Sequence, residues 1–109
     1  APHLADAAKV ANLSSMLGSI ASVDGFHTPT YAISKAAQNM ATVLLAQALR
    51  ERGITVIALH PGWVQTDMGG KGAQVTPADS ALGLLGVIDS ATLADSGRFI
   101  DWQGNALPW

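Results

Sequence analysis

Short runs of apolar residues punctuate the chain, and each is followed by a segment rich in Gly, Ser or Pro. Residues 9–15 form the first run. Residues 54–59 form the second, which is β-branched and continuously apolar, as is typical of a strand buried on both faces of a parallel sheet. Residues 97–101 form the last. We predict a β-strand in each of these three runs.

Two segments have the pattern of helices. Residues 31–52 consist mostly of good helix formers, with a proline just before them and a glycine just after. Within them, Ile33, Met40 and Leu44 recur near helical spacing and alanines fill other faces, so we expect this helix to be buried on more than one side. The second helix is predicted for residues 76–88.

The second helix has a recognisable start. Thr76 is predicted as the N-cap and Pro77 as the first helical residue. The acidic side chain of Asp79 would interact favourably with the helix dipole. Residues 16–30 are expected to form a loop with little structure of its own, and residues 102–109 a tail. Strands that alternate with helices predict an α/β fold built from right-handed βαβ units around a parallel sheet.

Composition excludes several classes of function. The chain is 49% apolar and 13% charged, which is typical of a sequence that forms a core. A net charge of −2 without a basic cluster gives no support for nucleic-acid binding. There is no cysteine, and the three histidines match no metal-ligand spacing. No apolar run reaches the roughly 18 residues of a membrane span, and no signal peptide is visible, so a cytoplasmic location is expected.

Tyr31 and Lys35 lie four residues apart at the start of the long helix and therefore share one helix face. A free phenol, with a pKa of about 10, is a poor proton donor or acceptor at neutral pH. A lysine ammonium within a few ångströms favours the phenolate, so the pair could form a general acid/base. Taken alone, however, this spacing is more often a surface coincidence.

Polar residues also follow the first two predicted strands. Ser14 and Ser15 end the first strand, and the segment Pro61-Gly62 ends the second, with Thr66 a few residues later. Ligands bind beyond the carboxyl ends of parallel strands, so Ser15 is expected in the same crevice as the tyrosine, where its hydroxyl could bind a carbonyl oxygen. The alternatives are serines that only cap a strand and an ordinary Pro-Gly turn.

Taken together, these motifs resemble the C-terminal half of the short-chain dehydrogenase/reductase family, and the branch of C-factor and sniffer-type carbonyl reductases most of all. The resemblance covers nearly the whole chain from Lys9 onward. It rests on three motifs in the family's order: Asn12-Leu13-Ser14-Ser15-Met16-Leu17-Gly18, Tyr31-Ala32-Ile33-Ser34-Lys35-Ala36-Ala37 and His60-Pro61-Gly62-Trp63-Val64-Gln65-Thr66.

The resemblance implies a role for each catalytic position. Tyr31 would be the general acid that protonates a carbonyl oxygen as hydride arrives, or the base in the reverse direction. Lys35 would assist it and hydrogen-bond the nicotinamide ribose. Ser15 would orient the substrate carbonyl, with Ser19 as a second candidate.

The resemblance also implies binding positions. An NAD(P) cofactor, with NADP slightly favoured, would be held by Tyr31 and Lys35 and by the segment after the second strand. Residues 68–76 would form a substrate lid, and the substrate would be a small carbonyl compound or alcohol. The remaining cofactor positions would be Pro61, Gly62, Val64 and Thr66. The substrate pocket would be lined by Ser19, His27 and Trp63. For His27, a solvated histidine in a loop is the commoner interpretation.

The family's Gly-rich phosphate loop is absent from this sequence, and Ala1 begins what reads as the end of a helix already under way. We therefore expect residues 1–109 to be the C-terminal portion of one NAD(P)-binding Rossmann domain, a doubly wound parallel sheet, and to be inactive in isolation. The full-length parent would be a homo-oligomeric oxidoreductase. The alternative is a non-catalytic relative that uses the fold for binding or signalling.

Overall fold

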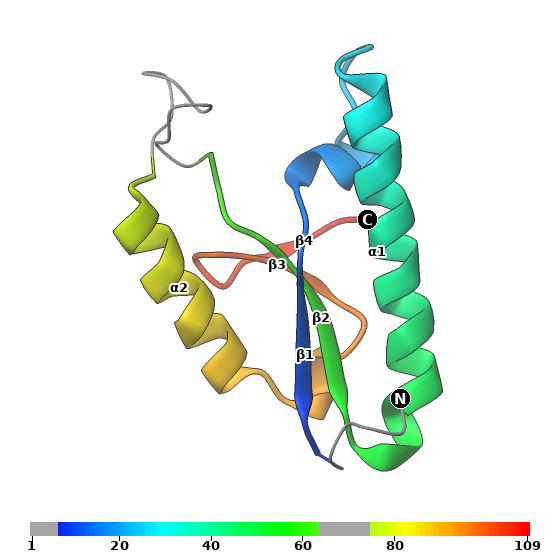
Figure 1. The fold of residues 1–109 in the computed structure, drawn as a ribbon, viewed down its shortest axis with the longest axis vertical. Helices are drawn as coiled ribbons and strands as arrows, with labels where there is room; N and C mark the ends of the chain where they lie inside the picture. The colour runs from blue at the N-terminus through cyan, green and yellow to red at the C-terminus, as the bar shows by residue number, and fades with distance from the viewer. Residues whose placement is uncertain (1–6, 64–74) are drawn as a thin grey trace.

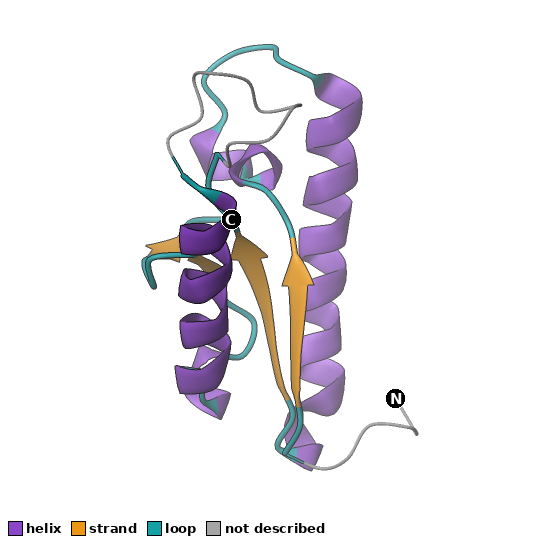
Figure 2. Ribbon diagram, turned by 60° about the vertical axis from the view of Figure 1, so that its left-hand side comes forward, coloured by secondary structure: helices purple, strands orange, loops and turns teal. Residues whose placement is uncertain are grey.

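The computed structural model describes residues 7–63 and 75–109, which form one sheet with a helix on each side (Figures 1 and 2). The strand order is β1-β2-β3-β4. The first three strands are parallel, as predicted, and β4 pairs antiparallel with β3. The strands are β1 (Lys9–Leu13), β2 (Thr55–His60), β3 (Phe99–Asp101) and β4 (Ala106–Leu107).

The two long helices cover opposite faces of β2 (Figure 1). Helix α1 (Pro29–Leu49) contributes Ala46 and Leu49 to a core cluster with Val56, while helix α2 (Pro77–Ser90) packs on Ile57. Successive residues of β2 thus enter different clusters, because side chains alternate between the faces of a strand. This arrangement confirms the prediction of a strand buried on both faces.

The termini of α2 are satisfied by side chains. Thr76 Oγ1 accepts the backbone N–H of Asp79 at 3.1 Å, which confirms the predicted N-cap. At the other end, Lys9 Nζ donates to the carbonyl oxygens of Ile88 (2.9 Å) and Asp89 (2.8 Å). A lysine ammonium at this position satisfies carbonyls that lack a partner within the helix, and its positive charge interacts favourably with the negative end of the helix dipole.

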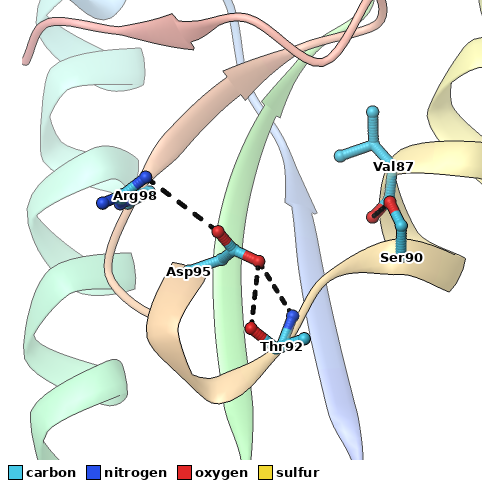
Figure 3. Close-up of polar contacts among 5 residues, drawn as sticks. All are labelled: Val87, Ser90, Thr92, Asp95 and Arg98. Atoms are coloured by element: carbon cyan, nitrogen blue, oxygen red, sulfur yellow. Dashed lines mark hydrogen bonds and ion pairs between the residues drawn. The ribbon is translucent and has the colours of Figure 1, made fainter.

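A compact turn leads from α2 into β3 (Figure 3). The short 3-10 helix η4 (Leu93–Asp95) begins with a capping box, in which the backbone N–H of Thr92 donates to Asp95 Oδ2 at 2.9 Å. Arg98 Nη1 lies 4.0 Å from Asp95 Oδ1. These contacts fix the start of β3 beside β2.

Two expectations about loops are wrong. The segment predicted as an unstructured loop contains two 3-10 helices, η1 (Met16–Gly18) and η2 (Ile20–Ser22). The segment predicted as a tail contains β4, because the Asp101 carboxylate accepts the backbone N–H groups of Gln103 (3.0 Å) and Asn105 (2.8 Å) and turns the chain back. The last residue also packs, since the ring of Trp109 stacks on Phe99 at 5.3 Å.

Within the described residues, α1 does not show the expected burial on more than one side. The side chains of Ile33, Met40 and Leu44 are 69%, 61% and 61% exposed, so the apolar stripe faces outward. The buried face instead carries Asn39 and Thr42 together with the alanine and leucine of the core. Polar side chains can occupy it because each hydrogen-bonds to a residue of β1 or the residue after it. Only one side of the helix is therefore buried against the described residues.

Two glycines three residues apart in α2 provide a matched test of this packing. A Cβ at Gly83 would collide with the carbonyl oxygen of Trp102, whereas a Cβ at Gly86 would meet nothing within 4 Å. We expect Gly83→Ala to destabilise the chain by about 1–3 kcal/mol. Gly86→Ala should be neutral or stabilise it by up to about 1 kcal/mol. Urea unfolding of both variants measures the difference, and equal stabilities would contradict the packing of α2 on Trp102.

Candidate active site

Tyr31 and Lys35 share the first turns of α1. Pro29 occupies the first helical position, and Lys35 Nζ lies 5.5 Å from the centroid of the Tyr31 ring. The Tyr31 side chain is 46% exposed and Lys35 is half-buried. The helix therefore brings the predicted pair together, with the phenol reachable from solvent.

Gln38 connects Lys35 to the sheet. Its Oε1 accepts a hydrogen bond from Lys35 Nζ at 3.3 Å, and its Nε2 donates to the carbonyl oxygen of Leu13 at 2.6 Å. The ammonium is thereby tied to the last residue of β1. Sequence reasoning missed Gln38, although a polar residue three positions after the lysine lies on the same helix face.

The two serines after β1 have different surroundings. Ser14 is only 5% exposed, and its hydroxyl donates to Asn39 Oδ1 at 2.6 Å. Ser15 is half-buried, and its Oγ accepts the N–H of Leu17 at 3.1 Å as the N-cap of η1. Ser14 therefore bonds inward to the helix, while the O–H hydrogen of Ser15 stays available to donate.

The turn that carries Ser15 is pressed against α1. A Cβ at Gly18 would lie 2.8 Å from the backbone carbon of Lys35 and 2.9 Å from Asn39 Nδ2. Asn39 Nδ2 also donates to the carbonyl oxygen of Gly18 at 3.3 Å. Only a residue without a side chain permits this approach, so the glycine sets how closely η1 lies to the helix turn of Lys35.

The end of β2 lies beside the end of β1, since Leu13 pairs with Leu59 in the sheet. Gly62 has a φ of 84° and a Cβ there would lie 2.8 Å from Trp102 Nε1, so this position requires glycine for its backbone conformation and for packing against Trp102. The carbonyl oxygen of Pro61 accepts the Ser80 hydroxyl at 2.6 Å. The segment after β2 is thus held from two sides.

His60 is a further titratable group at this edge of the sheet. Its Nδ1 accepts the backbone N–H of Met16 at 3.0 Å. Burial lowers the pKa of His60 from its usual value of 6.5, and the negative charge of Asp101 opposes that change. The imidazole is therefore neutral at neutral pH, as an acceptor nitrogen must be.

The other predicted residues lie apart from the Tyr31–Lys35 pair. Ser19 and His27 line a pocket of about 410 Å³ between the loop and the first turns of α1, and none of Ser15, Tyr31 and Lys35 lines it. The Ser19 hydroxyl is buried and contacts the carbonyl oxygen of Pro108 at 2.6 Å. His27 is exposed, 3.9 Å from Asp24.

The remaining predicted positions follow β2. Trp63 is exposed, and it is the last residue described before the gap in the structure. Val64, Thr66 and most of the predicted lid, residues 68–76, lie outside the described residues. Within the described part of the chain, no helix is long and apolar enough to cross a membrane.

Comparison with known proteins supports the resemblance to short-chain dehydrogenases. The family model of short chain dehydrogenases matches residues 2–75. C-signal of Myxococcus xanthus is 46% identical over 101 residues, which cover 93% of this chain and 61% of C-signal. The structure of NADPH-bound carbonyl reductase from chicken fatty liver is 40% identical with a TM-score of 0.84, covering 93% of this chain and 42% of that one. Carbonyl reductase Sniffer of D. melanogaster is 36% identical with a TM-score of 0.89, covering 93% and 41%.

The chain belongs to the short-chain dehydrogenase family, a family of oxidoreductases that includes these carbonyl reductases. The predicted α/β fold, part of a doubly wound Rossmann sheet, is confirmed by the same structures. The chain spans about half the length of its relatives, from 61% of C-signal to 41% of Sniffer.

The structural role of the Ser14 hydroxyl can be tested through stability. We expect Ser14→Ala to lower the free energy of unfolding by about 1–3 kcal/mol, because the buried Oδ1 of Asn39 loses its donor. Ser34 is an exposed residue of α1 whose hydroxyl donates only to the Tyr31 carbonyl, so Ser34→Ala should change stability by less than about 0.5 kcal/mol. Urea unfolding distinguishes them; a neutral Ser14→Ala would rule out a structural role for that hydroxyl.

Proposed function

We propose that the full-length protein transfers hydride between NAD(P)H and a carbonyl or alcohol substrate, with Tyr31 as general acid and base. The observation that carries this proposal is the Tyr31–Lys35 pair at the start of α1, with the Ser15 turn packed against the same helix. The nicotinamide supplies the hydride. NADP is favoured because the chicken carbonyl reductase was solved with NADPH bound.

The proton is the part of the reaction that this chain handles. In reduction, the Tyr31 hydroxyl donates its proton to the carbonyl oxygen of the substrate, and the nearby Lys35 ammonium stabilises the phenolate that remains. In oxidation the same phenolate accepts the proton of the alcohol. Gln38 keeps the ammonium on this side of the helix by accepting one of its hydrogens.

Ser15 positions the substrate. Its oxygen already accepts the Leu17 N–H, so its own hydrogen can donate to the carbonyl oxygen beside the tyrosine. We also propose that Lys35 binds the nicotinamide ribose and that the backbone at Pro61 and Gly62, continuing to Val64 and Thr66, binds the carboxamide. The adjacent carboxyl ends of β1 and β2 support this.

The chain spans 61% of C-signal, so the test uses a chimera in which the N-terminal part of C-signal precedes it. We expect the chimera to oxidise NADPH in the presence of small aldehydes or ketones, and Tyr31→Phe to reduce kcat by at least about 100-fold. Ser34→Ala is the matched control on the same helix turn, and the chain alone should be inactive. Full activity of the Tyr31→Phe chimera, with unchanged thermal unfolding, would refute the mechanism.

We further propose that the full-length protein forms a homo-oligomer through the outward face of α1. Ile33, Met40 and Leu44 form an exposed apolar stripe, and such stripes are typical of interfaces. Leu44→Glu should lower the molecular mass of the chimera in analytical ultracentrifugation. Leu85→Glu, which places the same charge on exposed α2, should not. A chimera that is monomeric before any substitution would contradict the proposal.

A further inference from the structure

We propose that His60 is a positioning residue for Ser15: its imidazole Nδ1 accepts the N–H of Met16 and so fixes the turn from which the Ser15 hydroxyl is presented. The inference rests on the proposed function, in which Ser15 orients the substrate carbonyl. His60 comes from the end of β2, 44 residues away in sequence from the turn that it holds. It makes no contact with the substrate in this scheme and acts only through Ser15.

The start of η1 needs this acceptor. The first N–H groups of any helix have no partner within it. Here the N–H of Leu17 donates to Ser15 Oγ at 3.1 Å, and that of Gly18 to the Ser15 carbonyl oxygen at 2.9 Å. The remaining N–H, that of Met16, donates to His60 Nδ1 at 3.0 Å. The three donors of the turn are thereby satisfied.

The position of the Ser15 hydroxyl depends on the hydrogen bond between Met16 and His60. If the imidazole were absent, the N–H of Met16 would be left half-buried without its acceptor, and the turn would have to shift to reach water or the Ser15 oxygen. Either shift moves the hydroxyl away from the carbonyl that it should bind. Errors of about 1 Å in such groups cost catalysis heavily.

His60 is well placed to hold the turn because the sheet holds His60 itself. Its carbonyl oxygen accepts the N–H of Trp102 at 2.9 Å, and it pairs with Asp101 in the register of β2 and β3. The carboxylate of Asp101 bonds to Gln103 and Asn105 in the turn before β4. Pairing with β3 thus fixes the backbone that carries the imidazole.

Protonation would break the contact. A doubly protonated imidazole presents an N–H at Nδ1, which would face the N–H of Met16. Burial lowers the pKa of His60. Among the described residues, the Asp101 carboxylate of β3 is the one charge that raises this pKa, and η1 carries no charged side chain. The unfolded chain therefore binds this proton more readily than the folded one. The stabilising contribution is complete above about pH 6.5 and is lost as the pH falls through the lowered pKa.

Two substitutions separate the acceptor from the size of the side chain. In His60→Asn, Oδ1 lies near the position of Nδ1 and can accept the Met16 N–H without titrating. In His60→Leu, a side chain of similar bulk has no acceptor. In the chimera at pH 7.5 we expect His60→Leu to lower kcat by about tenfold, the value of about one net hydrogen bond, with little change in KM for NADPH. His60→Asn should restore most of kcat and remove the part of the decline of kcat that follows protonation of His60 as the pH falls below 6.5.

The hydrogen bond itself can be observed without any assay of activity. In the chimera labelled with ¹⁵N, an N–H···N bond gives a scalar coupling between the Met16 amide nitrogen and His60 Nδ1. We expect this coupling at pH 7.5 and its loss at low pH. Amide exchange at Met16 should be about tenfold faster in His60→Leu and near the parent value in His60→Asn, while unchanged exchange in β2 would show that the leucine variant keeps its fold.

The outcomes are distinct. Absence of the coupling at pH 7.5, or a His60→Leu chimera with the parent kcat, would overturn the role of His60 and leave the proposed function intact. A His60→Asn chimera as slow as His60→Leu would also overturn it, because the acceptor alone would not suffice. If Ser15→Ala leaves kcat unchanged, the proposed function of Ser15 fails even where the coupling is present.

Discussion

Hydrogen bonds between the end of β1 and the inner face of α1 determine how the rest of the chain can function. Ser14 donates to Asn39, and the Asn12 side chain donates to Thr42 at 3.0 Å. The Ser14 bond spans 25 residues and the Asn12 bond 30, and each joins β1 or the residue after it to α1. Polar pairs have a narrower geometry than apolar contacts, so they fix the rotation of the helix about its axis as well as its distance from the sheet.

That rotation carries Tyr31 with it. Tyr31, Lys35, Gln38 and Thr42 are spaced by four, three and four residues and therefore form one stripe along α1. Anchoring Thr42 over β1 places the earlier members of the stripe beyond the strand's carboxyl end, where Ser15 lies. The apolar stripe is turned outward for the same reason. The residue that anchors the helix to β1, Thr42, and the candidate catalytic residues, Tyr31 and Lys35, thus lie on one face of α1.

The sequence was sufficient for features that depend on neighbouring residues. The Thr76 N-cap and the Tyr31–Lys35 pair each involve partners within four positions, and the β-branched run of β2 identified a buried strand by itself. Features that depend on distant partners were missed. Hydrogen bonds to Ser14 and Asn12 determine which face of α1 is buried. The turn at Asp101 produces β4, and the register of the sheet brings His60 to Met16. Adjacent serines acquire different roles only when the strand's register is known.

The engagement of Lys9 with the end of α2 has a consequence for the behaviour of the chain in solution. Among the described residues β1 is one of the two edge strands of the sheet, and proteins commonly protect such edges with lysine. The sole charged side chain of β1 is instead committed to the carbonyl oxygens of Ile88 and Asp89. This edge is therefore mostly apolar and carries no free charged side chain, which makes it a template for pairing with a further strand, including one from a second copy of the chain during aggregation.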